Sequence, residues 1–220
     1  MIPKYTFFRI LWNQMTYQEL RLKLQGFAVF NLSDIRRVDP GFYLARLNDW
    51  QAKKYIVKLR RGHYMFRDRP LSEETLFLIA NRLYQPSYVS LESALSYYGL
   101  IPEGVYSVTS ISTKKTARFI APVAGFLYRN VKPSSFFGYA LAKQNGQGYT
   151  IADMEKAFLD YVYLHPRIAN KADFHEWRFN GEAFLAKADV AKLRRYAAAF
   201  GSKVLVVRVE RLLRMMKRNP

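Results

Sequence analysis

The chain has 220 residues, of which 50% are hydrophobic, 16% aromatic and 24% charged. This composition supports a packed core and excludes a disordered chain. Because there is no cysteine, disulfides, thiolate metal sites and cysteine nucleophiles are also excluded. No apolar run approaches the roughly 18 residues of a membrane span, and the N-terminal apolar patch is interrupted by Arg9. We therefore expect no membrane segment and no signal peptide.

The net charge is the most informative feature of the composition. The chain carries 35 Lys and Arg against 17 Asp and Glu, a net charge of +18. Such an excess predicts a polyanionic partner, most often nucleic acid, although a basic protein without such a partner is the alternative. Residues 1–70 hold 14 basic and 5 acidic residues, residues 71–191 hold 12 and 11, and residues 192–220 hold 9 and 1. The basic head and tail therefore flank a nearly neutral middle.

The charge distribution and the interruption at Pro70 predict two domains, residues 1–70 and residues 71–220. The first is expected to contain three helices. Capping-box spacing from Thr16 to Glu19 opens one helix, and a short helix is predicted over residues 31–37. Asp39 then caps a helix that runs from Pro40 to about Lys53. A helix, a tight turn and a second helix form the helix-turn-helix pattern.

A basic hairpin follows these helices. A two-residue turn at Arg61-Gly62 pairs Arg60 with His63 and continues to a pair of Val57 with Phe66. In this register one face of the hairpin packs on the domain, and the other carries Lys58, Arg60 and His63. A hairpin in this place is typical of the wing of a winged helix, which contacts the DNA backbone while a helix enters the major groove.

The predicted partner is double-stranded DNA, an operator with inverted repeats. The residues expected to bind it are Ser33, Arg36, Arg37, Tyr43, Arg46, Asn48, Asp49, Lys53, Lys54, Lys58, Arg60, Arg61 and His63. On the predicted helix, Tyr43, Leu44, Leu47 and Trp50 lie on the packed side, and the polar residues lie opposite. Two alternatives remain: a solvated basic surface, and a winged helix that binds protein.

The second domain is expected to mix helices with short strands. Helical spacing covers residues 72–83, 90–99 and 153–164, and alternating patterns predict strands at 105–109, 118–121 and 126–130. The predicted fold class is therefore α+β, with an N-terminal winged helix-turn-helix domain followed by a mixed α+β domain with a small antiparallel sheet.

Five segments carry a resemblance to a known family. They are LRRGHYMF (59–66), YVSLESALSYYGLIPE (88–103), VYSVTSISTKKT (105–116), FLYRNVKP (126–133) and IADMEKAFLDYVYL (151–164). In their order they resemble the AbiEi family of type IV antitoxins, over roughly residues 15–200, although Met154 stands where a proline is expected. The resemblance implies a bacterial, cytoplasmic protein whose N-terminal domain represses its own operon. It also implies that the C-terminal domain counteracts a nucleotidyltransferase-like toxin, a genetic partner for which direct contact is not implied.

Two other functions are considered. Asp153, Glu155 and Lys156 are residues of the types that a metal-dependent nuclease uses, but on a strand the adjacent Glu155 and Lys156 would point to opposite faces. Asp153 is therefore interpreted as a helix cap with Glu155 in the first turn. His165, His175 and Glu176 lack metal-ligand spacing, so no metal, no cofactor and no catalytic residue is expected. The other candidate is a ligand-responsive transcription factor unrelated to a toxin.

The C-terminal tail contains two basic amphipathic stretches, over residues 190–200 and 205–218. Together with a hairpin loop they form a predicted secondary basic surface of Lys114, Lys115, Arg194, Arg195, Arg208, Arg211, Arg214, Lys217 and Arg218. Three roles are open: additional contact with the DNA backbone, binding to an acidic protein, and contact with a membrane surface. The last stretch has no interfacial Trp, which makes the membrane role the weakest of the three.

Overall fold

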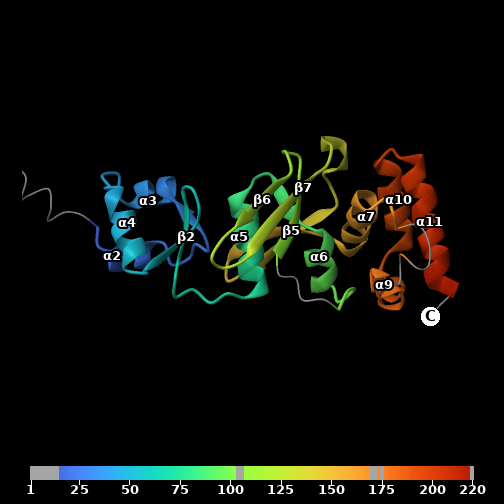
Figure 1. Ribbon diagram of the computed structural model, residues 1–220, viewed down its shortest axis with the longest axis horizontal. Coiled ribbons are helices and arrows are strands. Elements are labelled where there is room, and N and C mark those ends of the chain that lie inside the picture. The colour runs from blue at the N-terminus through green and yellow to red at the C-terminus, as the bar shows by residue number, and fades with distance from the viewer. Residues whose placement is uncertain (1–14, 103–106, 169–172, 174–175, 219–220) are drawn as a thin grey trace, which may run out of the picture.

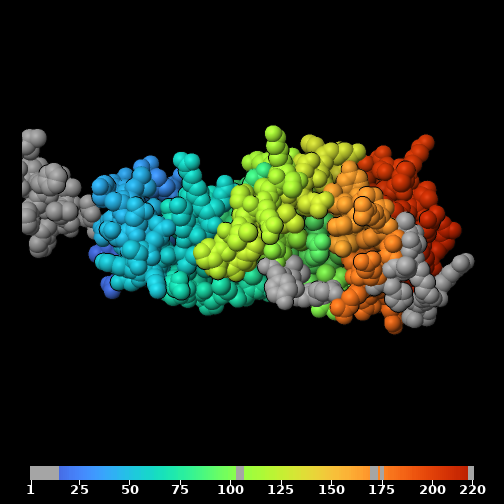
Figure 2. Space-filling model, in the orientation of Figure 1, coloured from blue at the N-terminus to red at the C-terminus, as the bar shows by residue number. Residues whose placement is uncertain are grey.

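The computed structural model describes residues 15–102, 107–168, 173 and 176–218. This part of the chain is elongated, with a small N-terminal unit at one end, a larger sheet in the middle and the C-terminal helices at the other end (Figure 1). The space-filling view shows the three parts in succession along the long axis (Figure 2). We call residues 15–66 the head and the described residues from 73 onward the body. No helix among the described residues is long and apolar enough to cross a membrane.

The head combines three short helices with a three-stranded antiparallel sheet of order β1-β3-β2. Its elements are α2 (Tyr17–Lys23), β1 (Phe30–Asn31), α3 (Leu32–Val38), α4 (Ala45–Ala52), β2 (Ile56–Arg60) and β3 (His63–Phe66). The predicted capping box of Thr16 and Glu19 is confirmed, and Asn31 forms a second one with Asp34 at the start of α3. In each box, the side chain of the first residue accepts the backbone N–H of the acidic residue three positions on, whose carboxylate accepts the backbone N–H of the first.

The predicted start of the second helix at Pro40 is wrong, because α4 begins only at Ala45 and has no side-chain cap. The chain turns before it because Phe42 is buried in the head core, where its ring lies 5.5 Å from that of Trp50. This turn leaves Tyr43 and Leu44 on the surface, 62% and 49% exposed. Their predicted place on the packed side of the helix is therefore also wrong.

The hairpin has the predicted turn, with Gly62 at a positive φ of 78°, and Arg60 pairs with His63. The remaining register is shifted by one residue, because a bulge between Lys58 and Arg60 leaves Leu59 outside the pairing. Leu59 is thereby directed into the core of the body, in the same cluster as Met65. Both faces of the hairpin are therefore packed, and the prediction of one packed and one cationic face is wrong.

The body contains a six-stranded sheet of order β6-β7-β5-β4-β9-β8. Its strands are β4 (Ser87–Val89), β5 (Ser107–Ser112), β6 (Ala117–Ile120), β7 (Gly125–Asn130), β8 (Tyr139–Gln144) and β9 (Gln147–Ala152). The pairs β5–β7 and β4–β9 are parallel, so the prediction of a small antiparallel sheet in this domain is wrong. The first two residues of the strand predicted over 105–109 lie outside the described residues.

Helices pack on this sheet, and the last of them form the end of the molecule far from the head (Figure 1). They are α5 (Glu73–Leu83), α6 (Leu91–Tyr97), α7 (Met154–Leu164), α9 (Gly181–Lys187), α10 (Val190–Ala199) and α11 (Lys203–Arg218), with a 3₁₀ turn, η1 (Pro133–Ser135). The helices predicted near residues 72, 90 and 153 are confirmed, and Ser72 and Asp153 cap α5 and α7 through their side chains. Because α7 packs against both α6 and α10, one core continues from the sheet into the C-terminal helices.

The head is joined to the body by polar contacts as well as by the shared core. Arg82 of α5 donates to the buried carboxylate of Asp34 at 2.9 Å. Arg60 donates to the carbonyl of Leu83 at 2.6 Å, and its guanidinium carbon lies 4.5 Å from the centre of the Phe119 ring. Arg60 of the head and Arg82 of the body therefore each bond to the other part across the junction.

Candidate nucleic-acid interface

The exposed surface of the head is built around α4. Leu47 and Trp50 are buried in the head core, which orients the helix and leaves Asn48, Asp49 and Lys53 exposed on its other side. This exposed ridge is the one predicted for DNA binding. It carries an amide, a carboxylate and an ammonium group within a turn and a half.

The head carries further exposed cations. Five basic side chains on α3, on the turn after α4 and on the hairpin are exposed, and none forms an ion pair or a side-chain hydrogen bond within the described part of the chain: Arg36, Lys53, Lys54, Lys58 and Arg61. Ser33 and Arg37 are also exposed, and Arg37 lies 3.8 Å from Asp34. Most of the predicted DNA-binding residues are therefore on the surface of one small unit.

Arg46 lies differently from its predicted position. Its guanidinium carbon is 5.3 Å from the centre of the Trp50 ring, so the side chain covers the packed tryptophan. The prediction placed Arg46 opposite Trp50, but residues four apart on a helix are neighbours on the same side.

Two hairpin residues are less available than predicted. Arg60 faces the body through its bond to Leu83, so its assignment to an open cationic face is wrong. His63 is half-buried, with Nδ1 3.2 Å from the carbonyl oxygen of Arg61. Burial lowers the pKa of His63, which keeps the imidazole neutral near pH 7. The cationic part of the hairpin is therefore its tip and its outer strand.

The residues considered for a nuclease have structural partners in the body. The Asp153 side chain accepts the backbone N–H of Lys156 at 2.9 Å, which confirms its role as the cap of α7. Asp153 and Glu155 both lie 2.9 Å from Nζ of Lys192, which ties α10 to the start of α7. Among the described residues no group of His, Cys, Asp and Glu could hold a metal ion, and His175 lies outside them.

Lys156 belongs to a buried polar cluster. It pairs with Asp160 one turn along α7, and both side chains are fully buried. Asp160 also accepts hydrogen bonds from the hydroxyls of Tyr88, at 3.0 Å, and Ser90, at 2.8 Å. Burial raises the pKa of Asp160 and lowers that of Lys156. Since neither side chain reaches the surface, the cluster acts within the core and offers no open site to a substrate.

The basic tail packs its apolar side into the body and uses some of its cations internally. Arg194 forms two hydrogen bonds to Glu210, of 2.7 and 3.1 Å, which join α10 to α11. Arg208 donates to the carbonyl of Val162 at 2.8 Å, and burial lowers its pKa, so its assignment to the basic surface is wrong. The tail also lies at the opposite end of the molecule from the head (Figure 1).

The other members of the predicted secondary surface vary in their surroundings. Arg195, Arg211, Arg214 and Lys217 are exposed on α10 and α11, and the Arg218 side chain lies outside the described residues. Lys114 and Lys115 are exposed between β5 and β6, and Nζ of Lys114 lies 5.7 Å from the centre of the Tyr84 ring. This surface is therefore spread over separate parts of the body.

Comparison with known proteins does not assign a function to these surfaces. No protein-family model matches the chain, and no curated protein matches it. The expected resemblance to AbiEi antitoxins therefore rests on the five quoted segments alone, and the function has to be inferred from the head and the body themselves.

Proposed function

We propose that the protein binds double-stranded DNA through its head and represses transcription of its own operon, as the antitoxin of a type IV toxin–antitoxin system. The observation that carries the DNA-binding proposal is the exposure of five cations on the head that form no ion pair within the described part of the chain. Cations held around one helix can contact the phosphates on either side of a groove while the helix reads the bases.

The order of elements supports a winged-helix interpretation of the head. A helix, a strand, two helices and two strands follow one another, and β1 pairs with β3. In this interpretation α4 is the recognition helix, and Lys58 and Arg61 belong to the wing. Asn48 suits a base contact because its amide can bond adenine at two points.

The antitoxin part of the proposal comes from the resemblance to AbiEi proteins over roughly residues 15–200. It assigns neutralisation of a nucleotidyltransferase-like toxin to the body. The nuclease alternative has less support, because it requires Lys156 at an open metal site and this side chain is fully buried. The proposal therefore assigns the protein no catalytic activity.

DNA binding is tested by fluorescence anisotropy with a duplex taken from upstream of the gene. If about five phosphates are neutralised, log K should fall against log salt with a slope of roughly −4 to −5. Lys53→Ala should weaken binding and flatten the slope by about one, while Lys187→Ala on α9, exposed at the far end, should leave both unchanged. A slope flatter than about −2 would contradict binding through phosphates.

Neutralisation is tested with full-length variants and a toxin gene from the same operon, expressed from an unrelated promoter. A variant with Asn48→Ala and Lys53→Ala changes only exposed side chains, so it should fold, lose operator binding and still protect cells from the toxin. Growth is the readout. If protection disappears together with DNA binding, the assignment of neutralisation to the body is wrong.

A further inference from the structure

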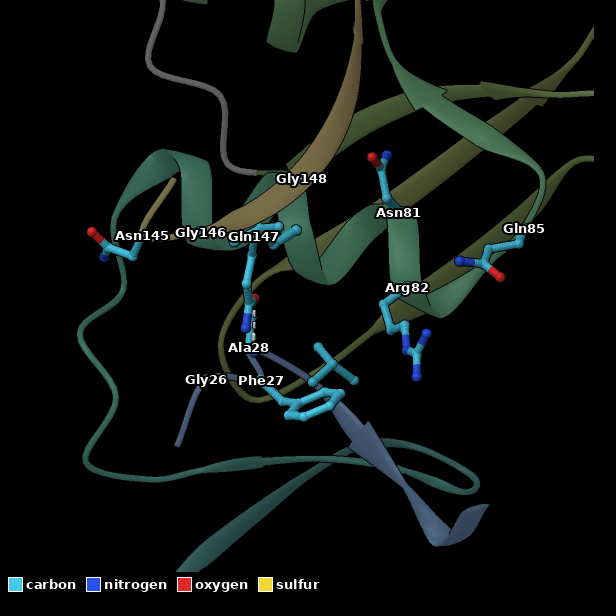
Figure 3. A pocket seen from close by; sticks show the side chains of 12 residues that line it. Gly26, Phe27, Ala28, Asn81, Arg82, Gln85, Asn145, Gly146, Gln147 and Gly148 are labelled. Atoms are coloured by element: carbon cyan, nitrogen blue, oxygen red, sulfur yellow. Dashed lines mark hydrogen bonds between the residues drawn. The ribbon is translucent and has the colours of Figure 1, made fainter. Parts of the chain in front are cut away.

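A cleft of about 480 Å³ lies where the head meets the body. Figure 3 shows its walls: the head loop from Gly26 to Val29, the end of α5 and the turn between β8 and β9. A second cleft, of about 500 Å³, shares Asn81, Gln85 and Gly148 with it and extends along β8 and β9. Each volume falls within the range of small-molecule sites, roughly 300 to 1,000 Å³.

The shared wall contains a buried donor group without a partner. Oδ1 of Asn81 accepts a hydrogen bond of 3.0 Å from Oγ1 of Thr150, which fixes the orientation of the amide. Its Nδ2 atom is buried and has no hydrogen-bond partner in the described ranges, and the same holds for Oγ of Ser87 in the second cleft. Because most buried polar atoms in folded proteins are paired, two such atoms in adjoining walls indicate a polar ligand.

The remaining walls define the chemistry of that ligand. Gln85 contributes an exposed amide, and Phe27 is 36% exposed. Gln147 is held in place because its Oε1 accepts the N–H of Ala28 at 3.0 Å (Figure 3). Arg82 is the one charged side chain among the described residues that line this cleft, and its guanidinium already pairs with Asp34.

Amide groups both donate and accept hydrogen bonds, as the edge of a nucleobase does. A single cation that is already paired does not favour a polyphosphate. We propose that the cleft between head and body binds a nucleobase or nucleoside, with Asn81 and Gln85, which line both clefts, bonding the edge of the base. This site is separate from the proposed DNA surface and does not depend on it.

The site is tested by isothermal titration calorimetry of the full chain in the absence of DNA. The probes are adenine, adenosine, guanosine, cytidine and uridine, with ribose, ATP and inorganic triphosphate as comparisons. We expect at least one base or nucleoside to bind, ribose not to bind, and ATP to bind no more tightly than adenosine. Binding of ATP and inorganic triphosphate with equal affinity, or of no base or nucleoside up to millimolar concentration, would overturn the proposal.

Variants locate the binding within the cleft. Gln85→Ala changes an exposed side chain and should weaken binding roughly two- to tenfold, the loss of one neutral hydrogen bond. Gln18→Ala removes an exposed glutamine of α2 outside the cleft and should change nothing. Asn81→Asp keeps the oxygen that Thr150 bonds but replaces the free donor with an acceptor, so it should weaken binding further. Wild-type affinity in both cleft variants would place the ligand elsewhere and refute the proposed site.

Discussion

The buried ion pair of Lys156 and Asp160 allows a quantitative test of the structure. Lys156→Met removes the positive charge and leaves Asp160 buried with the hydroxyls of Tyr88 and Ser90 as its remaining partners. Removing one partner of a buried pair typically costs about 3–5 kcal/mol, because the other charge is then uncompensated. We expect a loss of this size in the free energy of unfolding at pH 8.

The loss should depend on pH in a defined direction. Burial already raises the pKa of Asp160, and without the lysine nothing of opposite charge opposes this rise. A group whose folded pKa lies above its unfolded value stabilises the protein below the unfolded pKa, and this contribution is lost as the pH rises through the folded pKa. Lys156→Met should therefore be least destabilising near pH 4 and most destabilising at pH 8.

Urea unfolding is the assay, followed by tryptophan fluorescence, to which Trp177 contributes; its ring stacks on Tyr161 of α7 with ring centres 4.4 Å apart. Lys192→Met is the matched control, because its side chain is 29% exposed and also pairs with carboxylates. It should cost no more than about 1 kcal/mol. Adding Asp160→Asn to Lys156→Met removes the second charge and should recover most of the loss.

Three results would refute this reasoning. The first is a cost for Lys156→Met no larger than that of Lys192→Met. The second is a cost that stays constant between pH 4 and pH 8. The third is a double variant no more stable than Lys156→Met alone. Any of them would mean that Lys156→Met does not leave Asp160 as an uncompensated buried charge.

Three further predictions concern the junction, the core and the DNA surface. Asp34→Ala removes a capping box and the ion pair across the junction, so it should lower the free energy of unfolding in urea by about 2–4 kcal/mol. Thr16→Ala, which removes an exposed cap, should lower it by about 1 kcal/mol, and equal losses would contradict a role for the junction. Phe184→Ala, at a fully buried site, should cost about 3–5 kcal/mol by calorimetry, and a loss under 1 kcal/mol would place the ring outside the core. In anisotropy, Asn48→Ala should weaken binding to the operator by about 1–3 kcal/mol and leave binding to random duplexes nearly unchanged. Arg61→Ala should weaken binding to the operator and to random duplexes equally, and the reverse pattern would exchange the roles of the two residues.

Local features of the fold could be predicted from the sequence. Ser72 and Asp153 were expected to begin helices, and both do so through a side-chain bond to the backbone three residues on. Such a bond depends only on neighbouring residues, so the sequence contains all that it requires. The turn at Arg61-Gly62 is equally local, since it needs a residue that accepts positive φ.

Pairing between distant segments could not be predicted in the same way. The parallel pairs β4–β9 and β5–β7 depend on which strands meet, and period-two patterns do not contain that information. The hairpin of β8 and β9 was missed although Asn145-Gly146, a common turn pair, lies between its strands. The bulge at Leu59 could not be predicted for another reason. It directs Leu59 into a core formed largely by the body, which the sequence of the hairpin does not contain.

The sequence by itself determined that this protein is strongly basic, that the charge is concentrated at its two ends, and that the head contains several of the cations. Only the tertiary structure decided which of them are exposed. Arg60 bonds to the carbonyl of Leu83 and Arg208 to the carbonyl of Val162, whereas Lys53 and Arg61 are exposed to solvent. Side-chain charge is a property of the residue, but exposure and pairing depend on neighbours brought together from distant parts of the chain.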